Sequence, residues 1–236
     1  MLNIDNLTVH YGSALALNNV SLHVKKQEAV CVLGSNGAGK TTLLNAILNI
    51  IPKKGRVLYK NIDITNKKTK DIVLLGISYI PDKRTIFKDM SVYDNLLIPA
   101  MRLIKLHGKN YFDRSLKELL NNFSSIGDKL RLKAGYLSGG EQQMLSIMQG
   151  LLREPELLIL DEPTAGLSPK LINEVFNILY LLKDRNIATL IVEQNINKTL
   201  RYADRAYIME VGKIVDKGES KFIFDKDSIK KAYLGG

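Results

Sequence analysis

The sequence contains one cysteine, Cys31, and few long apolar runs. A single cysteine has no partner within the chain, which excludes a secreted scaffold held by disulfides and indicates a reducing compartment. A membrane-spanning helix needs roughly 18 consecutive apolar residues, and no stretch of the sequence approaches that length. Residues 1–5 lack the basic and apolar regions of a signal peptide. We therefore expect a protein that is made and kept in the cytoplasm.

The chain does have an ordinary globular composition and an excess of positive charge. Its 236 residues are 45% hydrophobic and 25% charged, which suits one large domain and excludes disorder for most of the chain. The formal net charge is +10. This charge favours anionic partners such as nucleotides, nucleic acid or an anionic membrane surface. The lysines, however, occur in short separate clusters, which is more typical of solvated faces.

The hydrophobic pattern alternates between strand-like and helix-like segments. Short apolar or alternating runs predict strands at residues 2–9, 20–24, 29–33, 77–80, 156–160 and 188–192, and a hairpin at 205–216 that turns at Gly212. Helical periodicity covers residues 40–49, 169–182 and 196–203. Such alternation predicts an α/β fold with a mostly parallel sheet, in which ligands bind at the carboxyl ends of the strands.

A middle segment, from about residue 83 to 133, has a different pattern. Ser91 is followed three residues later by Asp94, a spacing typical of a helix start. Residues 111–123 repeat apolar side chains with a helical period. We therefore expect a single domain, 1–236, whose α/β core (1–82 and 155–236) carries a helical insert (83–154).

A glycine-rich loop follows the apolar run 29–33. It reads Gly34-Ser35-Asn36-Gly37-Ala38-Gly39-Lys40-Thr41-Thr42 and matches the P-loop pattern G-x-x-x-x-G-K-[ST]. The glycines allow backbone N–H groups to converge on phosphate oxygens, and the helix that begins here adds its positive end. We expect Lys40 to neutralise the β- and γ-phosphates, Thr41 to bind Mg²⁺ and Thr42 to reach toward the α-phosphate.

Two acidic residues follow the apolar run 156–160. A buried strand delivers Asp161 to the edge of the sheet beside the P-loop, where its carboxylate can hold Mg²⁺ through water. Glu162 comes next and can accept a proton from an attacking water. Many strands end in Asp-Glu, so this pattern alone is weak evidence. Together with a P-loop it is strong evidence for a nucleotide site.

A second anion-binding element begins at residue 137 and reads Leu137-Ser138-Gly139-Gly140-Glu141-Gln142-Gln143. Ser138 and Glu141 have the spacing of a capping box, and the two glycines leave the backbone N–H groups of the first turn bare. This sequence, with Ser138 placed 23 residues before Asp161, resembles the signature motif of the ATP-binding cassette (ABC) ATPases. The resemblance covers essentially the whole chain.

The resemblance implies a P-loop NTPase (RecA-like) core, an N-terminal antiparallel β subdomain and an inserted α-helical signature subdomain. It also implies ATP with Mg²⁺ as ligands, and a head-to-tail dimer with a second ABC ATPase subunit. In that dimer, Ser138, Gly139, Gly140 and Glu141 of one subunit complete the ATP site of the other. Tyr11 matches the aromatic residue that stacks on adenine, and a surface tyrosine at a turn is the alternative interpretation.

Further positions support or modify this assignment. Residues 165–168 lie where the family has the D-loop, which contacts the partner subunit. The guanine-reading pattern Asn-Lys-x-Asp is absent from the sequence, which disfavours GTP. Asp82 replaces the family's usual glutamine, and it could approach Mg²⁺ or its water with shorter reach. Gln194 replaces the usual histidine; an amide can donate to the γ-phosphate but cannot shuttle a proton. The sequence offers no reason for the pair Gln149-Gly150.

Four short segments resemble the second ATPase subunit of the high-affinity branched-chain amino acid importers. They are Asp82-Lys83-Arg84-Thr85-Ile86-Phe87, Val192-Glu193-Gln194-Asn195, Gly166-Leu167-Ser168-Pro169 and residues 232–235. This implies an importer ATPase on the cytoplasmic face of the inner membrane, bound to two membrane permease subunits and served indirectly by an external solute-binding protein. Importers of urea or short-chain amides use near relatives.

The permease is expected to dock on the insert between residues 82 and 137. Ile86, Phe87 and Met90 either line that groove or pack the interior of the insert. The alternative function is a soluble ABC protein acting on ribosomes or DNA, which the positive charge favours. The single cassette and the short spacing between Lys40 and Asp161 oppose it, so we expect no nucleic acid partner. A P-loop kinase would leave the Ser138 motif unexplained.

Overall fold

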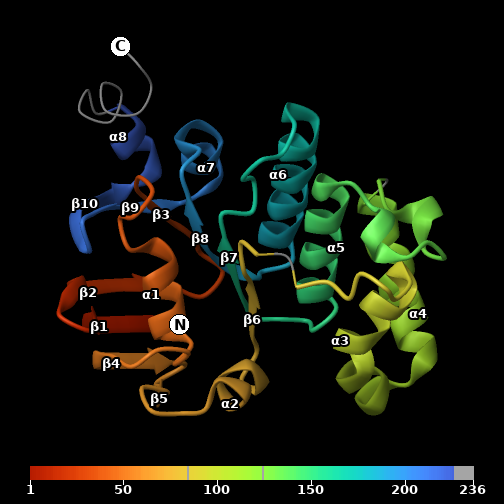
Figure 1. Ribbon diagram of the computed structural model, residues 1–236, viewed down its shortest axis with the longest axis horizontal. Coiled ribbons are helices and arrows are strands. Elements are labelled where there is room, and N and C mark those ends of the chain that lie inside the picture. Colours follow the sequence, from red (N-terminus) through yellow and green to blue (C-terminus); the bar gives the residue numbers. More distant parts are fainter. Residues whose placement is uncertain (84, 124, 226–236) are drawn as a thin grey trace.

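The computed structural model describes residues 1–83, 85–123 and 125–225, and these residues form two β-sheets with helices packed around the larger one (Figure 1). The smaller sheet is antiparallel, with strand order β2-β1-β4-β5. The larger sheet has the order β10-β9-β3-β8-β7-β6, in which only the β9–β10 pair is antiparallel. The predicted α/β class, with a mostly parallel sheet and an N-terminal antiparallel sheet, is confirmed.

The element bounds are as follows. The strands are β1 (Leu2–Tyr11), β2 (Ala14–Val24), β3 (Ala29–Leu33), β4 (Lys54–Tyr59), β5 (Ile62–Asp63), β6 (Ile77–Ile80), β7 (Leu157–Asp161), β8 (Ala188–Glu193), β9 (Arg205–Glu210) and β10 (Lys213–Glu219). The helices are α1 (Lys40–Ile47), α2 (Thr69–Leu74), α3 (Val92–His107), α4 (Lys109–Asn122), α5 (Gly139–Leu151), α6 (Pro169–Asp184), α7 (Ile196–Tyr202) and α8 (Ser220–Asp225), with short 3-10 turns at Gly127–Lys129 and Ala134–Tyr136.

The larger sheet separates distinct hydrophobic clusters, because successive side chains of a strand point to opposite faces. In β7, Leu157 and Ile159 join a cluster formed by α1 and the smaller sheet. Leu158 and Leu160 join a second cluster formed by α3, α4, α5 and α6. Both faces of this strand are therefore buried, which explains its continuous apolar sequence.

The pair Gln149-Gly150 in α5 has a structural explanation. A Cβ added to Gly150 would lie 2.9 Å from Cδ1 of Ile80, so glycine allows α5 to approach β6 closely. Nε2 of Gln149 donates to the backbone oxygen of Asn95 at 3.0 Å and links α5 to α3. The pair thus fixes α5 against both the sheet and the neighbouring helix.

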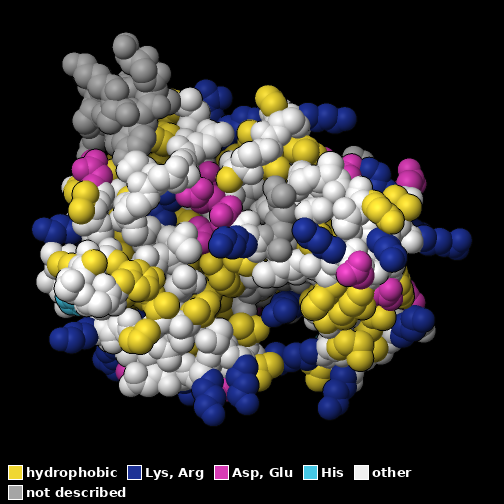
Figure 2. Space-filling model, in the orientation of Figure 1, with side chains coloured by type: hydrophobic (Ala, Val, Ile, Leu, Met, Phe, Trp, Pro, Cys, Tyr) yellow, Lys and Arg dark blue, Asp and Glu magenta, His cyan; other side chains and the backbone are white. Residues whose placement is uncertain are grey.

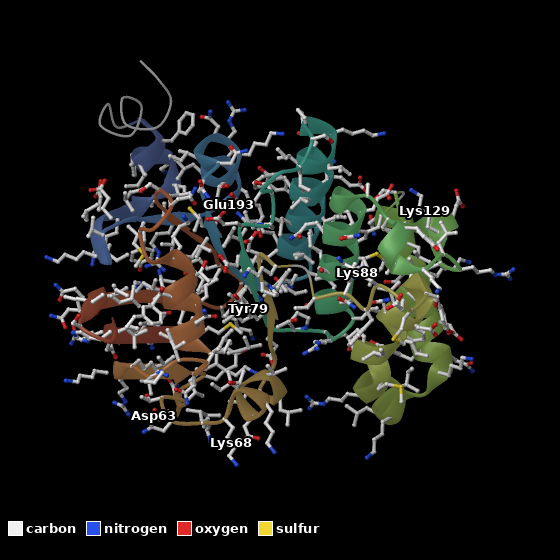
Figure 3. The ribbon with its side chains drawn as sticks, viewed as in Figure 1. Asp63, Lys68, Tyr79, Lys88, Lys129 and Glu193 are labelled. Carbon is white, nitrogen blue, oxygen red and sulfur yellow. The ribbon has the colours of Figure 1, made fainter. Side chains whose placement is uncertain are left out.

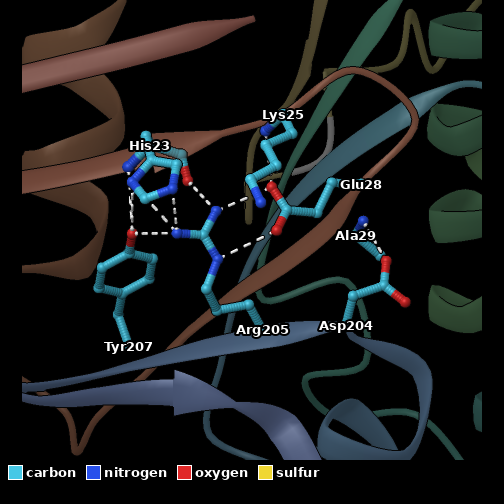
Figure 4. A network of polar contacts seen from close by, with 7 residues as sticks. All are labelled: His23, Lys25, Glu28, Ala29, Asp204, Arg205 and Tyr207. Carbon is cyan, nitrogen blue, oxygen red and sulfur yellow. Dashed lines mark hydrogen bonds and ion pairs between the residues drawn. The ribbon is translucent and has the colours of Figure 1, made fainter.

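A polar cluster joins the smaller sheet to the larger one (Figure 4). Arg205, at the start of β9, donates to the backbone oxygen of His23 in β2 and to the carboxylate of Glu28, each at 2.8 Å. Its guanidinium also contacts the His23 ring and donates to the hydroxyl of Tyr207 at 2.9 Å. These contacts hold β2 beside β9 and fix the entry to β3, the strand that carries the P-loop.

The predicted segments are found in the structure, and the hairpin turns at Gly212 as predicted. Most of their ends differ by three residues or fewer, but β2 begins at Ala14, six residues before the predicted start at Val20. The elements β4, β5, α2 and α8 were not predicted from the sequence. Ser91 caps α3 as expected, since its side chain accepts from the backbone N–H of Asp94 at 3.0 Å. Arg84 and residues 232–235, which were part of the subfamily resemblance, lie outside the described residues. Within the described part of the chain, every helix is too short or too polar to cross a membrane.

Candidate nucleotide-binding site

The strand register brings three chemically active segments to one edge of the larger sheet. Leu33, the last residue of β3, pairs with Glu193 at the end of β8, and Asp161 of β7 pairs with Val192. The P-loop, Asp161-Glu162 and Gln194 therefore emerge side by side, as expected for the carboxyl ends of parallel strands. Figure 2 shows acidic side chains gathered on this face, beside α1.

The P-loop owes its shape to two glycines with positive φ. Gly37 has a φ of 81° and Gly39 a φ of 102°, conformations that other residues rarely adopt. Gly39 forms the N-cap of α1, so the loop turns directly into the helix. Gly34 also needs its lack of a side chain, since a Cβ there would lie 2.4 Å from the backbone oxygen of Met209. The backbone N–H groups of this turn are thereby free of covering side chains.

Lys40 is folded back into the loop. Its side chain is only 4% exposed, and Nζ donates to the backbone oxygens of Gly34 at 2.8 Å and Ser35 at 3.0 Å. The same ammonium group forms an ion pair with Oε1 of Glu162 at 3.1 Å. The cation that is expected to bind phosphate and the carboxylate that is expected to activate water are thus held together.

A cavity of about 260 Å³ lies over the P-loop. Its P-loop lining consists of Asn36, Gly37, Gly39, Lys40, Thr41 and Thr42. Glu162 also lines it, together with Leu15 and Ala16 of β2 and the β9–β10 turn at Val211-Gly212. The β2 and turn residues were not predicted to line the site, because no local motif shows that these distant segments meet at the loop.

The carboxylate of Asp161 lies between two hydroxyl groups. Oγ1 of Thr41 donates to its Oδ1 and the hydroxyl of Tyr79 donates to its Oδ2, both at 3.2 Å. Burial raises the pKa of Asp161, and the charges of Glu162 and Asp82 add to that rise, whereas the two hydrogen bonds oppose it. The structure thus brings together Thr41 and Asp161, the pair that the sequence assigned to Mg²⁺, and it adds Tyr79, which the sequence did not indicate.

Glu162 and Gln194 are joined directly. Nε2 of Gln194 donates to Oε2 of Glu162 at 2.6 Å and to Oδ1 of Asn36 in the P-loop at 2.7 Å. The backbone of Glu162 has a φ of 46°, a sparsely populated conformation that is often found at functional sites. Gln194 therefore connects the carboxylate to the phosphate-binding loop.

The buried side chain of Glu193 holds the residues next to Glu162 and Gln194 in place. No role was predicted for it from the sequence. It is 2% exposed, and its Oε1 accepts from the backbone N–H and the hydroxyl of Thr164 at 2.9 and 2.7 Å. Its Oε2 accepts from the backbone N–H of Gln194 at 3.0 Å. Burial raises the pKa of Glu193, and these hydrogen bonds oppose the rise. The carboxylate fixes the chain on both sides of the site; Figure 3 labels it at the end of β8.

Two predicted residues lie at the margin of the site. Asp82 is exposed, two residues beyond β6, and its charge raises the pKa of both Asp161 and Tyr79. Tyr11 ends β1, pairs with Ala14 and is 52% exposed, but it is not among the residues that line the cavity. The structure therefore places Asp82 within electrostatic reach of the metal-binding candidates and leaves Tyr11 free on the surface.

The Ser138 motif forms the expected capping box but lies away from the P-loop cavity. The backbone N–H of Glu141 donates to Oγ of Ser138 at 3.4 Å, and the backbone N–H of Ser138 donates to Oε2 of Glu141 at 3.0 Å. Ser138 and Gly139 are exposed, while Gly140 packs against Leu171 of α6. In Figure 1, β7, β8 and α6 lie between α1 and α5. The start of α5 thus faces outward instead of into the cavity of its own chain.

The residues fit a magnesium-bound nucleoside triphosphate. The loop offers bare backbone N–H groups and a buried ammonium group, and Thr41 and Asp161 present two oxygen ligands 3.2 Å apart. Among the described residues, no group of three or more His, Cys, Asp or Glu side chains could hold a metal ion. The Thr41–Asp161 oxygen pair suits Mg²⁺, because that ion usually takes one or two protein oxygens and completes its shell with water and phosphate.

Comparison with known proteins gives the family. The residue pattern of the ABC transporter family matches residues 17–165, which is more than half of the chain and includes the P-loop, the Ser138 motif and Asp161-Glu162. The chain belongs to the ABC transporter family. It is the ATP-binding ATPase subunit of a transporter, and ATPases of this family work as dimers with membrane permease components.

Several curated ABC proteins are similar over the whole length of this ABC ATPase. The high-affinity branched-chain amino acid transport ATP-binding protein BraG of Pseudomonas aeruginosa is 35% identical, with 100% of both chains covered. The probable branched-chain amino acid transport ATP-binding protein LivF of Archaeoglobus fulgidus is 34% identical, over 100% of this chain and 99% of the relative. The lipopolysaccharide export system ATP-binding protein LptB of Escherichia coli is also 34% identical, over 99% and 97%.

Solved structures agree with the family assignment. An ATP-binding cassette of an ABC transporter in its ADP conformation has a TM-score of 0.85 and 30% identity, covering 100% of this ABC ATPase and 99% of that chain. A dimeric bacterial ABC transporter cassette has a TM-score of 0.84 at 24% identity, covering 93% and 99%, and so shares the fold.

Proposed function

We propose that this chain hydrolyses ATP between two ABC subunits and thereby drives import of branched-chain amino acids. The observation that carries the catalytic part is the meeting of Lys40, Glu162 and Gln194 over the P-loop, within contacts of 2.6–3.1 Å. The outward position of the Ser138 motif supports a site completed by a second subunit, either another copy or a different ABC ATPase. The full-length similarity to two branched-chain amino acid transport ATPases supports the substrate.

The geometry supports a different role for each polar residue of the site. Phosphate oxygens compete with Glu162 for the Lys40 ammonium group, so nucleotide binding opens the ion pair and leaves the carboxylate to accept a proton from water. Gln194 orients Glu162 and can donate to the γ-phosphate. Mg²⁺ held by Thr41 and Asp161, with Asp82 near its water shell, would neutralise charge on the phosphates.

The ATP-bound dimer completes the arrangement. Ser138, Gly139 and Gly140 present the positive end of α5 to the γ-phosphate held by the partner's P-loop. Glu141 holds this turn through the capping box, and Tyr11 stacks on the adenine. The two subunits close together because ATP binds the closed dimer better than the open one. The D-loop at 165–168, which is mostly exposed here, lies at the subunit contact.

A surface suited to the permease lies between α2 and α3. A cavity of about 390 Å³ there is lined by Leu74 and Leu75 on one side and by α3 residues such as Leu106 on the other. Met101 and Leu106 of α3 are 59% and 63% exposed, so their apolar side chains are open to contact with a partner. We assign this groove to a cytoplasmic segment of a permease subunit, and two such subunits would hold the ATPases at the cytoplasmic face of the membrane. An external solute-binding protein would deliver the amino acid.

Ile86, Phe87 and Met90, which precede α3, divide between the two roles expected for them. Ile86 is partly buried against the cluster of α3, α4, α5 and α6, so it packs the interior. Phe87 is exposed and is available to the permease. Met90 is half-buried, and its backbone oxygen accepts from the N–H of Ala134 at 2.9 Å, which joins the segment before α3 to the turn before α5.

The similarity to LptB supports a second candidate, the ATPase of a lipid exporter. Importers of urea or short-chain amides are a further possibility for the substrate, and a soluble ribosome- or DNA-acting ABC protein is the alternative without a permease. These candidates share the ATP chemistry and differ in the membrane chains that bind the ATPase. Identification of the permeases that co-purify with the chain, and of the solute they carry, therefore separates them.

The catalytic proposal is tested by Glu162→Gln in the ATPase with its permease complex. We expect turnover to fall by at least about 100-fold, because a general base contributes that much or more, while ATP binding persists. The control is Glu210→Gln, an exposed acid at the end of β9. Uptake of labelled leucine into cells should fail with Glu162→Gln and persist with the control. Parental turnover in Glu162→Gln would contradict the base assignment, and normal leucine uptake in a strain lacking the chain would contradict the substrate.

A further inference from the structure

The signature turn contains a negative charge close to where it is proposed to meet a phosphate. Glu141 is the third residue of α5, and its carboxylate accepts from the backbone N–H of Ser138 at 3.0 Å. An acid in the first turn stabilises the helix itself through the capping box and the helix dipole. It also opposes an incoming phosphate, because the two negative charges repel. The motif therefore needs a compensating positive charge if it is to bind ATP.

Lys129 supplies that charge. Its ammonium group forms an ion pair and a hydrogen bond with Oε1 of Glu141, the carboxylate oxygen that the capping box does not use. Burial alone would raise the pKa of Glu141, but the bonds from Lys129 and from the Ser138 backbone lower it below its ordinary value. The carboxylate is thus held ionised and paired, and the ion pair places the Lys129 ammonium group at the first turn of α5.

The backbone around Lys129 is itself fixed. Its N–H donates to the oxygen of Ile126 at 2.9 Å, and its oxygen accepts from Leu132 at 2.9 Å. The next residue, Leu130, accepts from the N–H of Tyr93 in the first turn of α3 at 2.9 Å. The ammonium group is therefore presented from a turn that is attached to α3, and α3 packs against α5.

We propose that Lys129 is a positioning residue for the nucleotide site of the partner subunit: it neutralises Glu141 and holds the capping box, so that the start of α5 attracts the γ-phosphate. This inference rests on the proposed ATP-bound dimer. It accounts for a carboxylate at a position where an uncharged amide would satisfy the same capping box without repelling phosphate.

The test measures the ATP concentration that gives half-maximal dimer formation in the Glu162→Gln background, with the second ATPase supplied if the pair is a heterodimer. Lys129→Met should raise that concentration about fivefold, from the loss of a partly exposed charge near a helix end. Lys129→Arg should restore the parental value. In Glu141→Gln, which removes the charge that Lys129 neutralises, Lys129→Met should change it less than about twofold.

The outcomes separate this inference from the proposed function. If Glu162→Gln forms no ATP-dependent dimer, the proposed function fails and the inference fails with it. If that dimer forms and Lys129→Met leaves its ATP dependence unchanged, the inference alone is overturned. Lys129→Met could also weaken the dimer by the same factor in the parent and in Glu141→Gln. Lys129 would then act through the general stability of the insert, and the inference would again be overturned. Thermal unfolding of each variant confirms that the chains compared are folded.

Discussion

The amide nitrogen of Gln194 lies 2.6 Å from Oε2 of Glu162, in a position where many ATPases of this family are expected to carry a histidine. The same nitrogen lies 2.7 Å from Oδ1 of Asn36. An amide has no proton to relay at neutral pH, so its contribution is to orient the carboxylate and to donate a hydrogen bond. Gln194 is thus placed to orient the Glu162 carboxylate without taking a proton from it.

Gln194→Ala should lower ATP turnover about 10- to 100-fold by removing this donor, with a smaller effect on KM for ATP. The reason is that Glu162 loses its orientation, whereas the P-loop loses only the bond to Asn36 and keeps the phosphate-binding Lys40 in place. Steady-state kinetics measure the two effects separately. Asn197→Ala, on the exposed side of α7, is the control and should leave both constants unchanged. A large rise in KM with unchanged kcat would assign Gln194 to nucleotide binding instead.

Tyr79→Phe removes the hydroxyl that donates to Oδ2 of Asp161 at 3.2 Å. Partners of metal-binding carboxylates commonly contribute about 10-fold or more to metal affinity, so the Mg²⁺ concentration for half-maximal ATPase activity should rise by about that factor. Activity at saturating Mg²⁺ should recover. A loss of activity that Mg²⁺ does not restore would show that Tyr79 acts on folding or on the reaction itself.

Gly150→Ala tests the close packing of α5 on β6. The added methyl group would lie 2.9 Å from Cδ1 of Ile80, and overpacking of this kind costs about 1–3 kcal/mol of unfolding free energy. Alanine is otherwise the better helix former, so an open site would be stabilised by the same change. Gly127→Ala is the matched control, since a Cβ there meets no atom within 4 Å. Chemical denaturation of the two variants gives the comparison, and equal stabilities would contradict the packing.

The stability of the protein should fall at mildly acidic pH because of His23. Burial lowers the pKa of His23 below its ordinary value of 6.5; Arg205, Lys25 and Lys217 add to that effect, and Glu28 opposes it. A lowered pKa in the folded state means that the unfolded chain binds the proton first. The contribution of His23 is therefore present above about pH 6.5 and is lost as the pH falls through the lower folded value. His23→Gln should flatten the stability profile in that window, and an unchanged slope would contradict the assignment.

The central strands of the larger sheet, such as β3 and β7, could be predicted because burial on both faces gives them continuous apolar sequences. The segment Lys54–Tyr59 was not predicted as β4, since Lys54, Gly55 and Arg56 are exposed and break the apolar pattern. Its pairing with β1, a strand distant in sequence, provides the stabilisation that local preference does not. The short helices α2 and α8 have too few residues for a periodic pattern to be recognised.

In the candidate site too, residues in local motifs could be predicted, and contacts between distant segments could not. Lys40, Thr41, Asp161 and Glu162 stand in local motifs, and the sequence assigned each a chemistry. Other contacts join segments that are remote in the chain, such as Glu193 with Thr164 and Lys129 with Glu141. The lining from β2 and from the turn at Gly212 also depends on how the two sheets pack. No spacing rule connects such residues, so only the fold could show them.

The central claim is that two chains of this kind hold one triphosphate between a P-loop and a signature turn. The most direct measurement is the mass of Glu162→Gln in solution by sedimentation, with and without ATP, alone and with the second ATPase of its transporter. We predict a monomer without nucleotide and a stable dimer with ATP, which Ser138→Arg disrupts while ATP still binds. An ATP-loaded chain that remains monomeric under all of these conditions would contradict the account.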